Sequence, residues 1–126
     1  MIAHTYTNFQ NTQNTKKIVE TVDLSKVDIN KVFDLICLRS LKKINYFWLG
    51  YRDYSKMWEI QIMLQEKVKN NEINDVVLFL EHNPVYTLGR NADKTNLLPN
   101  KPNKIQVIQT DRGGDVTFHG PGQLIG

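Results

Sequence analysis

The sequence predicts an α/β fold. Two segments with helical apolar spacing, residues 28–43 and 51–70, alternate with short apolar segments that suit β-strands. One of these, residues 76–80, is apolar at every position, which is typical of a central strand buried on both faces. The length of 126 residues, with 40% hydrophobic and 23% charged residues, indicates one domain of ordinary globular composition.

The first predicted helix begins at a cap on Asp28 or Asn30 and ends near Lys43, since Asp and Asn side chains can accept from the first free backbone N–H groups. Cys37 lies within it and is interpreted as a small buried hydrophobe, because the local spacing places no His or Lys beside it. The residues expected on its apolar face are Val32, Phe33, Ile36, Leu38 and Leu41.

A first strand is predicted at residues 45–49, which are rich in aromatic side chains, and Gly50 is expected to end it. The second helix follows at about residues 51–70 and leaves through Asn70-Asn71, because Asn tolerates the left-handed conformation at a helix end. The residues expected on its buried side are Tyr54, Met57, Trp58, Leu64 and Val68.

The apolar strand 76–80 delivers Glu81 and His82 at its carboxyl end, where α/β folds commonly hold their sites. Pro84 prevents this strand from continuing, so residues 85–88 are expected to form a short second strand or an extended loop. Downstream, the sequence predicts a surface turn at 100–103, a strand at 105–108 and a turn at 111–114 that leads to Val116.

Residues 112–123, Arg-Gly-Gly-Asp-Val-Thr-Phe-His-Gly-Pro-Gly-Gln, are the most informative segment. The glycine pair 113–114 has two compatible interpretations: a tight turn between strands, or a wall whose N–H groups polarise an acyl carbonyl. If residues 116–119 are extended, their side chains alternate. Val116 and Phe118 are then expected to face the core, and Thr117 and His119 a ligand.

The net charge of +3 lies in the first 43 residues, which hold seven basic and four acidic residues, whereas residues 44–126 hold nine of each. A nucleic-acid-binding protein would concentrate its Lys and Arg on the folded module, so no nucleic-acid partner is expected.

No apolar run reaches the roughly 18–20 residues needed to cross a bilayer, and His4, His82 and His119 show no metal-ligand spacing. Residues 1–19 contain no acidic residue and are interpreted either as an organelle transit segment or as a polar tail.

Three motifs occur in the same order as in a known family: Leu49-Gly50 followed by Tyr54 and Met57, the segment 80–90 (Leu-Glu-His-Asn-Pro-Val-Tyr-Thr-Leu-Gly-Arg), and the segment 112–123. Together they resemble the octanoyltransferases, or lipoyl(octanoyl) transferases, of the lipoate/biotin protein ligase superfamily. The resemblance implies a mixed β-sheet with helices packed mainly on one face. It divides the chain into an N-terminal extension, 1–43, and the N-terminal part of a catalytic domain, 44–126.

The resemblance implies transfer of an octanoyl group from acyl carrier protein to a lysine of lipoyl-domain proteins, such as the acyltransferase component of 2-oxoacid dehydrogenases and the glycine-cleavage H protein. No cofactor, metal or ATP is needed, and no membrane partner is expected. The compartment would be a mitochondrion or other organelle in a eukaryote and the cytoplasm in a bacterium. The substrate-binding residues that it implies are Arg112, Gly113, Gly114, Asp115, Val116, Thr117, Phe118, His119, Gly120, His82 and Tyr54.

In that family a cysteine and a lysine beyond the position of Gly126 carry the chemistry, whereas the one cysteine here is Cys37. The chain is therefore expected to lack the catalytic pair and to be inactive by itself. Two alternatives remain: an ATP-dependent lipoate or biotin protein ligase, and a non-catalytic fragment that binds acyl groups or their carrier.

Individual residues also have structural interpretations beside the functional ones. His119 could bond the glycine-rich backbone, His82 could cap a loop and Tyr54 could belong to the core. Arg112 could pair with Asp111 or Asp115, or bind an acidic carrier protein.

Overall fold

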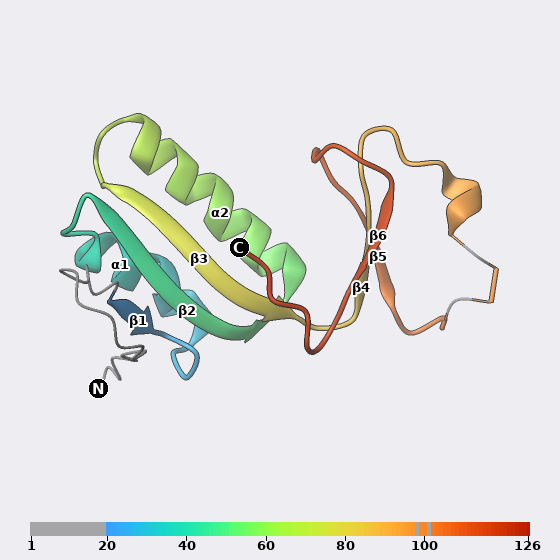
Figure 1. The fold of residues 1–126 in the computed structure, drawn as a ribbon, viewed down its shortest axis with the longest axis horizontal. Coiled ribbons are helices and arrows are strands. Elements are labelled where there is room, and N and C mark those ends of the chain that lie inside the picture. Colours follow the sequence, from blue (N-terminus) through green and yellow to red (C-terminus); the bar gives the residue numbers. More distant parts are fainter. Residues whose placement is uncertain (1–19, 98, 101) are drawn as a thin grey trace, which may run out of the picture.

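A computed structural model describes residues 20–97, 99–100 and 102–126. Within these residues the chain forms two α-helices and two three-stranded sheets (Figure 1). No described helix has both the length and the apolar character needed to span a membrane. The elements are β1 (Thr21–Asp23), α1 (Ile29–Arg39), β2 (Ile44–Arg52), α2 (Tyr54–Lys69), β3 (Asp75–His82), β4 (Val85–Leu88), the 3-10 turn η1 (Lys94–Asn96), β5 (Gln106–Gln109) and β6 (Val116–His119).

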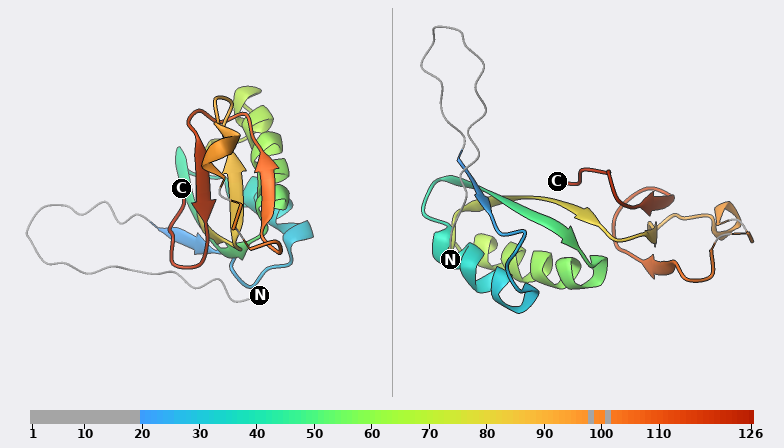
Figure 2. Two further views of the ribbon diagram at one scale, coloured as in Figure 1. Left: turned by 90° about the vertical axis from the view of Figure 1, so that its right-hand side faces the viewer. Right: turned by 90° about the horizontal axis from the view of Figure 1, so that it is seen from below.

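The first sheet has the order β1-β2-β3, and all its strands are parallel. Helices α1 and α2 connect successive strands, and right-handed crossovers that advance in one direction place both helices on the same face (Figure 2). The second sheet has the order β5-β4-β6, in which β4 is parallel to β5 and antiparallel to β6. The predicted α/β fold, with mixed strand directions and helices on one face, is confirmed.

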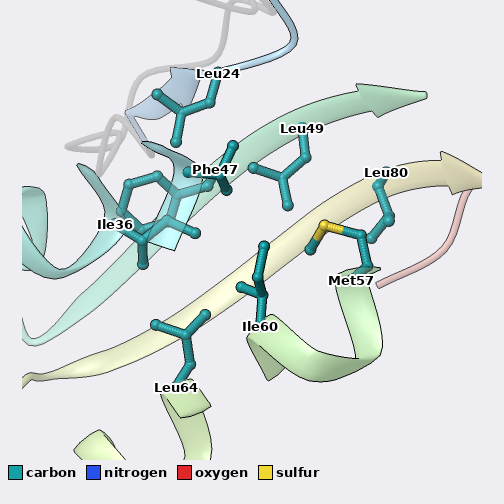
Figure 3. Packing of buried hydrophobic residues seen from close by; sticks show 9 residues of the cluster. Leu24, Ile36, Phe47, Leu49, Met57, Ile60, Leu64 and Leu80 are labelled. Atoms are coloured by element: carbon teal, nitrogen blue, oxygen red, sulfur yellow. The ribbon is translucent and has the colours of Figure 1, made fainter. Parts of the chain in front are cut away.

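The hydrophobic core lies between the first sheet and its two helices (Figure 3). Alternate residues of β2 point into it, so that Phe47 and Leu49 are fully buried. Helix α1 contributes Val32 and Ile36 from one stripe, which are also fully buried. The remaining members are Leu24, Met57, Ile60, Leu64 and Leu80.

Strand β1 and helix α1 share this core with β2, although both lie in the predicted N-terminal extension 1–43. The division at residue 43 stays a prediction. Strand β1 was not predicted from the sequence, because three residues carry too little pattern to distinguish a strand from a loop. The polar tail predicted at residues 1–19 lies outside the described residues.

Helix α1 begins as predicted, with the Asp28 side chain accepting from the Asn30 N–H, but it ends at Arg39 rather than near Lys43. Two residues expected on its apolar face are exposed: Leu38 at 71% and Leu41 at 84%. Leu38 lies about 200° around the helix from Ile36, and Leu41 follows the helix end. Cys37 is half-buried against the core, and burial raises the pKa of its thiol, which agrees with its interpretation as a small hydrophobe.

Strand β2 does not end at Gly50, as predicted, but continues to Arg52 with an irregular register between Trp48 and Tyr51. Gly50 has φ +66°, a left-handed conformation in which glycine avoids the steric cost of a side chain. It therefore forms a bulge within the strand instead of its end.

Helix α2 begins at Tyr54, after the Asp53 side chain accepts from the Lys56 N–H, so the predicted start at residue 51 is wrong. Residues 51 and 52 belong to β2 instead. The exit through Asn70-Asn71 is confirmed, because Asn71 has φ +58°. The buried residues of α2 are Met57, Ile60 and Leu64, whereas Tyr54, Trp58 and Val68 are half-buried.

Strand β3 was predicted to be central and buried on both faces, and this is wrong for the described part of the chain. It lies at one side of its sheet, and residues 76–79 are only half-buried. Its outer edge meets one antiparallel bridge, between Leu80 and Ile125. On the face away from the helices the rings of Tyr46 and Phe79 stack, with their centroids 6.5 Å apart. The apolar run 76–80 therefore marks a strand whose two faces are both partly buried.

The second sheet follows the predicted order. Strand β4 at 85–88 is confirmed, β5 begins at Gln106 rather than Ile105, and the turn at 111–114 leads into β6. The predicted turn 100–103 includes residue 101, which lies outside the described residues.

The side chains of β6 alternate as predicted, but Phe118 does not face the core. It is 48% exposed, and its ring packs 5.2 Å from that of its cross-strand partner Tyr86. His119 is opposite Val85, and Thr117 is opposite Thr87, both of which are buried. The face expected to meet a ligand therefore lies opposite two buried residues of β4, whereas on the other face only Val116 lies opposite a buried one, Leu88.

Replacing Gly50 by alanine is expected to destabilise the fold by about 1–3 kcal/mol, because the residue keeps positive φ and the new Cβ would lie 2.7 Å from Ser25 Cβ. Gly113→Ala is the matched control, since a Cβ there has no atom within 4 Å. Urea denaturation of both variants measures the difference. Equal stability of the two variants would contradict the assigned bulge.

The exposure of Phe118 predicts a small stability effect. Phe118→Ala is expected to cost less than about 1 kcal/mol, whereas Phe47→Ala, at a fully buried position, is expected to cost about 3–5 kcal/mol. Thermal and urea unfolding of the two variants compare them directly. A large loss in Phe118→Ala would place its ring in the core after all.

Candidate functional site

A cavity of about 680 Å³ lies along helix α2 and strand β3. Its wall is mostly apolar, and the residues that form this part are Met57, Trp58, Leu64, Val68, Val76, Val77, Leu78, Leu80 and Ile125. Four further side chains gather where α2 begins and β3 ends: Tyr54, His82, Arg112 and His119. At the opposite end, Lys69 and Asp75 border the same cavity. The site therefore combines a long apolar wall with one aromatic and polar end.

The parallel register of the first sheet brings Tyr54 and His82 together. Arg52, the last residue of β2, pairs with His82, the last residue of β3, and the Asp53 cap then starts α2. The Tyr54 ring consequently lies 4.9 Å from the His82 ring, measured between centroids. The His119 ring reaches the same place from β6 and lies 6.0 Å from both rings.

His82 is buried, and its Nδ1 lies 3.0 Å from the backbone oxygen of Arg52. A carbonyl oxygen only accepts, so Nδ1 carries the proton and donates. Burial lowers the pKa of His82 below the usual value of about 6.5, and the hydrogen bond to Arg52 opposes this shift only in part. His82 is therefore neutral at pH 7.

The Arg112 guanidinium donates hydrogen bonds to neighbouring groups of the same chain. Its Nε and Nη2 donate to Thr87 Oγ1 at 3.1 and 2.7 Å, and Nη2 also lies 2.9 Å from the backbone oxygens of Thr87 and Asp115. Its Nη1 donates to the Gly113 oxygen at 2.8 Å. Of the expected partners, Asp115 thus contributes its backbone rather than its carboxylate. Arg112 stabilises the turn and borders the cavity.

The glycine-rich turn packs closely on the end of β4. A Cβ on Gly89 would lie 2.1 Å from the Gly114 oxygen, and Gly114 has φ +88°. The Asp115 carboxylate accepts from the Asp93 backbone N–H at 2.9 Å and from the Asn96 side chain, which attaches the loop before β5 to the same turn. These contacts agree with the interpretation of the glycine pair as a tight turn.

Both nitrogens of the His119 ring have partners. Nε2 lies 3.3 Å from Thr87 Oγ1, and Nδ1 lies 2.9 Å from Gln123 Oε1. Close by, Glu81 accepts from the Gly122 N–H at 2.6 Å and so connects the end of β3 to the turn after β6.

The other residues predicted for the site do not line the cavity: Gly113, Gly114, Asp115, Val116, Thr117, Phe118 and Gly120. Conversely, Thr87 and Gln123 were not predicted as site residues, although they bind the side chains of Arg112 and His119. A threonine in a short strand has no pattern that distinguishes it from any other β-branched residue. The described residues contain no group of three or more His, Cys, Asp or Glu side chains that could hold a metal ion.

Comparison with known proteins decides the family. A family model described as "Lipoyl protein ligase A/B catalytic domain" matches residues 53–126, more than half of the chain. The chain belongs to this family. The match includes α2, β3 and the whole glycine-rich segment, and thus every residue of the polar end of the cavity.

Octanoyltransferases are among the most similar curated relatives of this lipoyl protein ligase A/B family member. The proteins of Alkaliphilus metalliredigens and Koribacter versatilis are 46% identical over 87 residues and 45% identical over 82 residues. That of Corynebacterium diphtheriae is 43% identical over 77 residues. These alignments cover 66%, 62% and 61% of this chain but 40%, 33% and 30% of the respective relatives. The chain therefore spans well under half the length of these bacterial relatives.

The depressed pKa of His82 predicts a pH-dependent stability. Below about pH 6.5 the His82 side chain takes up a proton more readily in the unfolded state than in the native state. The free energy of unfolding should therefore fall as pH decreases from about 7 to 5, by at most about 1.4 kcal/mol per pH unit. Urea denaturation across this range measures the slope. His82→Gln should flatten it, and an unchanged slope would show that other groups cause the pH dependence.

Proposed function

We propose that this chain supplies the acyl-binding part of an octanoyltransferase, which transfers octanoyl groups from acyl carrier protein to a lysine of lipoyl-domain proteins. The observation that carries the proposal is the apolar cavity lined at one end by Tyr54, His82 and His119, in a member of the lipoyl protein ligase A/B family. The named relatives, all octanoyltransferases, support acyl carrier protein as the donor.

The cavity suits an unbranched acyl chain. Its volume of about 680 Å³ lies within the range of small-molecule sites, and its wall is formed by α2 and β3 along their length. Each methylene that leaves water contributes about 0.8 kcal/mol. In the proposed binding mode the hydrocarbon lies between Trp58, Val68 and Leu78, and the thioester carbonyl lies at the end formed by the two histidines.

The proposed reaction needs no oxidant, metal or nucleotide. The amine nitrogen of the acceptor lysine forms a bond to the thioester carbonyl carbon, the carbon–sulfur bond breaks, and the proton lost by the amine ends on the departing thiol. In the octanoyltransferase family a cysteine first takes the acyl group, and a lysine assists.

This chain has one cysteine, and its thiol is not at the cavity. Cys37 lies on α1 against the core, and burial raises the pKa of its thiol, which disfavours the thiolate. We therefore expect the 126-residue chain to bind an octanoyl donor without transferring the acyl group.

Octanoyl acyl carrier protein should bind the chain in calorimetry, whereas incubation with a lipoyl domain should yield no octanoyl-lysine by mass spectrometry. Val68→Glu, which puts a charge in the cavity wall, should weaken binding at least about tenfold. Ile62→Glu is the matched control, because Ile62 is exposed on the same helix and does not line the cavity.

Three outcomes would change this assignment. Equal weakening by both variants would show that the cavity is not the acyl site. Transfer that disappears in Cys37→Ser would make that thiol the nucleophile. ATP binding by calorimetry would favour the alternative of an ATP-dependent ligase.

A further inference from the structure

The two histidines of the site lie 6.0 Å apart, but their ring nitrogens have different surroundings. We propose that Thr87 and Gln123 are positioning residues that hold the His119 ring through both nitrogens, in the Nδ1–H form. His82 is then the one of the two that presents an unprotonated nitrogen, Nε2, to the cavity. This inference rests on the proposed function only for the identity of the group that His82 would bind.

Thr87 offers the His119 ring a hydroxyl that can donate. Thr87 is fully buried, and its Oγ1 receives two nitrogens of the Arg112 guanidinium at 2.7 and 3.1 Å. A guanidinium only donates, so Thr87 Oγ1 accepts in both contacts and its hydroxyl proton remains available for a third group. His119 Nε2 lies 3.3 Å from this hydroxyl and can accept its proton when Nε2 is unprotonated.

Gln123 completes the arrangement from the other side of the ring. His119 Nδ1 lies 2.9 Å from Gln123 Oε1, and an amide oxygen only accepts, so Nδ1 carries the proton. In the neutral ring Nε2 is then unprotonated and accepts from the Thr87 hydroxyl. The ring is thus fixed at two opposite positions, and its face lies against Tyr54 with an interplanar angle of 20°. In this arrangement His119 forms part of the cavity wall, and its lone pair is directed to Thr87.

His82 has the same tautomer, but its Nε2 has different surroundings. Its Nδ1–H donates to the Arg52 carbonyl, which leaves Nε2 unprotonated. In the described part of the chain no fully buried side-chain nitrogen or oxygen lacks a hydrogen-bond partner. Nε2 has no such partner there, so it must keep access to the cavity that His82 lines.

An accessible lone pair selects ligands that donate. His82 Nε2 is suited to accept a hydrogen bond from an N–H or O–H group at the polar end of the cavity. Under the proposed function this group is the amine of the incoming lysine. A carboxylate or phosphate ligand finds no donor at this nitrogen.

Long-range ¹H–¹⁵N correlation spectra of the histidine rings test the inference directly, because the two neutral tautomers give different nitrogen shifts. Spectra of the His4→Gln protein at about pH 8.5, where histidine is neutral, contain His82 and His119 alone. Both residues should show the Nδ1–H pattern. Gln123→Glu should leave it unchanged, since Gln123 already accepts. Thr87→Val should move the His119 shifts toward a mixture of tautomers, and Thr87→Ser should retain the wild-type pattern.

His82 serves as the internal reference, because its partner is a backbone carbonyl, and its shifts should stay constant in every variant. An Nε2–H pattern for His119 in the wild-type ring would overturn the inference, even if Thr87→Val failed to fold. A change of the His119 tautomer in Gln123→Glu would also overturn it. So would an unchanged His119 tautomer in a folded Thr87→Val protein. These outcomes do not depend on acyl binding or transfer, so they are distinguishable from a failure of the proposed function.

Discussion

The parallel pairing of β2 with β3 is the interaction on which the rest of the structure depends. Each strand packs one face against α1 and α2, with Phe47 at the centre of the core, and the register aligns Arg52 with His82. That alignment has two consequences at the site. The Arg52 carbonyl holds the His82 ring, and α2 starts beside it, so Tyr54 meets His82. Burial of apolar surface in one place thereby sets the geometry of polar groups in another.

A second constraint comes from the donor-only chemistry of the Arg112 guanidinium. Arg112 joins the glycine-rich turn to Thr87 of β4, and Thr87 in turn contacts His119 of β6. The turn can pack against the end of β4 because Gly89 has no side chain to collide with the Gly114 backbone. The Thr87 hydroxyl accepts from Arg112 and can still donate its own proton, and the Gln123 amide oxygen accepts from the other side of the His119 ring, so the two side chains together orient the imidazole.

The site separates two kinds of recognition. Helix α2 and strand β3 offer an apolar wall that gains free energy by removing hydrocarbon from water, without directional contacts. At the other end His82, beside half-buried Tyr54, is buried, neutral and hydrogen-bonded to the Arg52 carbonyl, so it can orient a polar group without a large desolvation cost. Such a division suits a ligand with a long apolar part and one reactive end, which is the chemistry of an acyl thioester.

The sequence by itself determined most of the local elements and pointed to the family. The cap at Asp28, the stop at Pro84 and the left-handed Asn71 depend on interactions within a few residues, so local patterns reveal them. Only the tertiary structure decided the half-buried position of β3, the exposure of Phe118 and the bulge at Gly50, because each depends on which segment packs alongside. The same holds for Thr87 and Gln123. Their importance arises from contacts with Arg112 and His119 that form only when β4, β6 and the turn between them are assembled, and no spacing along the chain records such contacts.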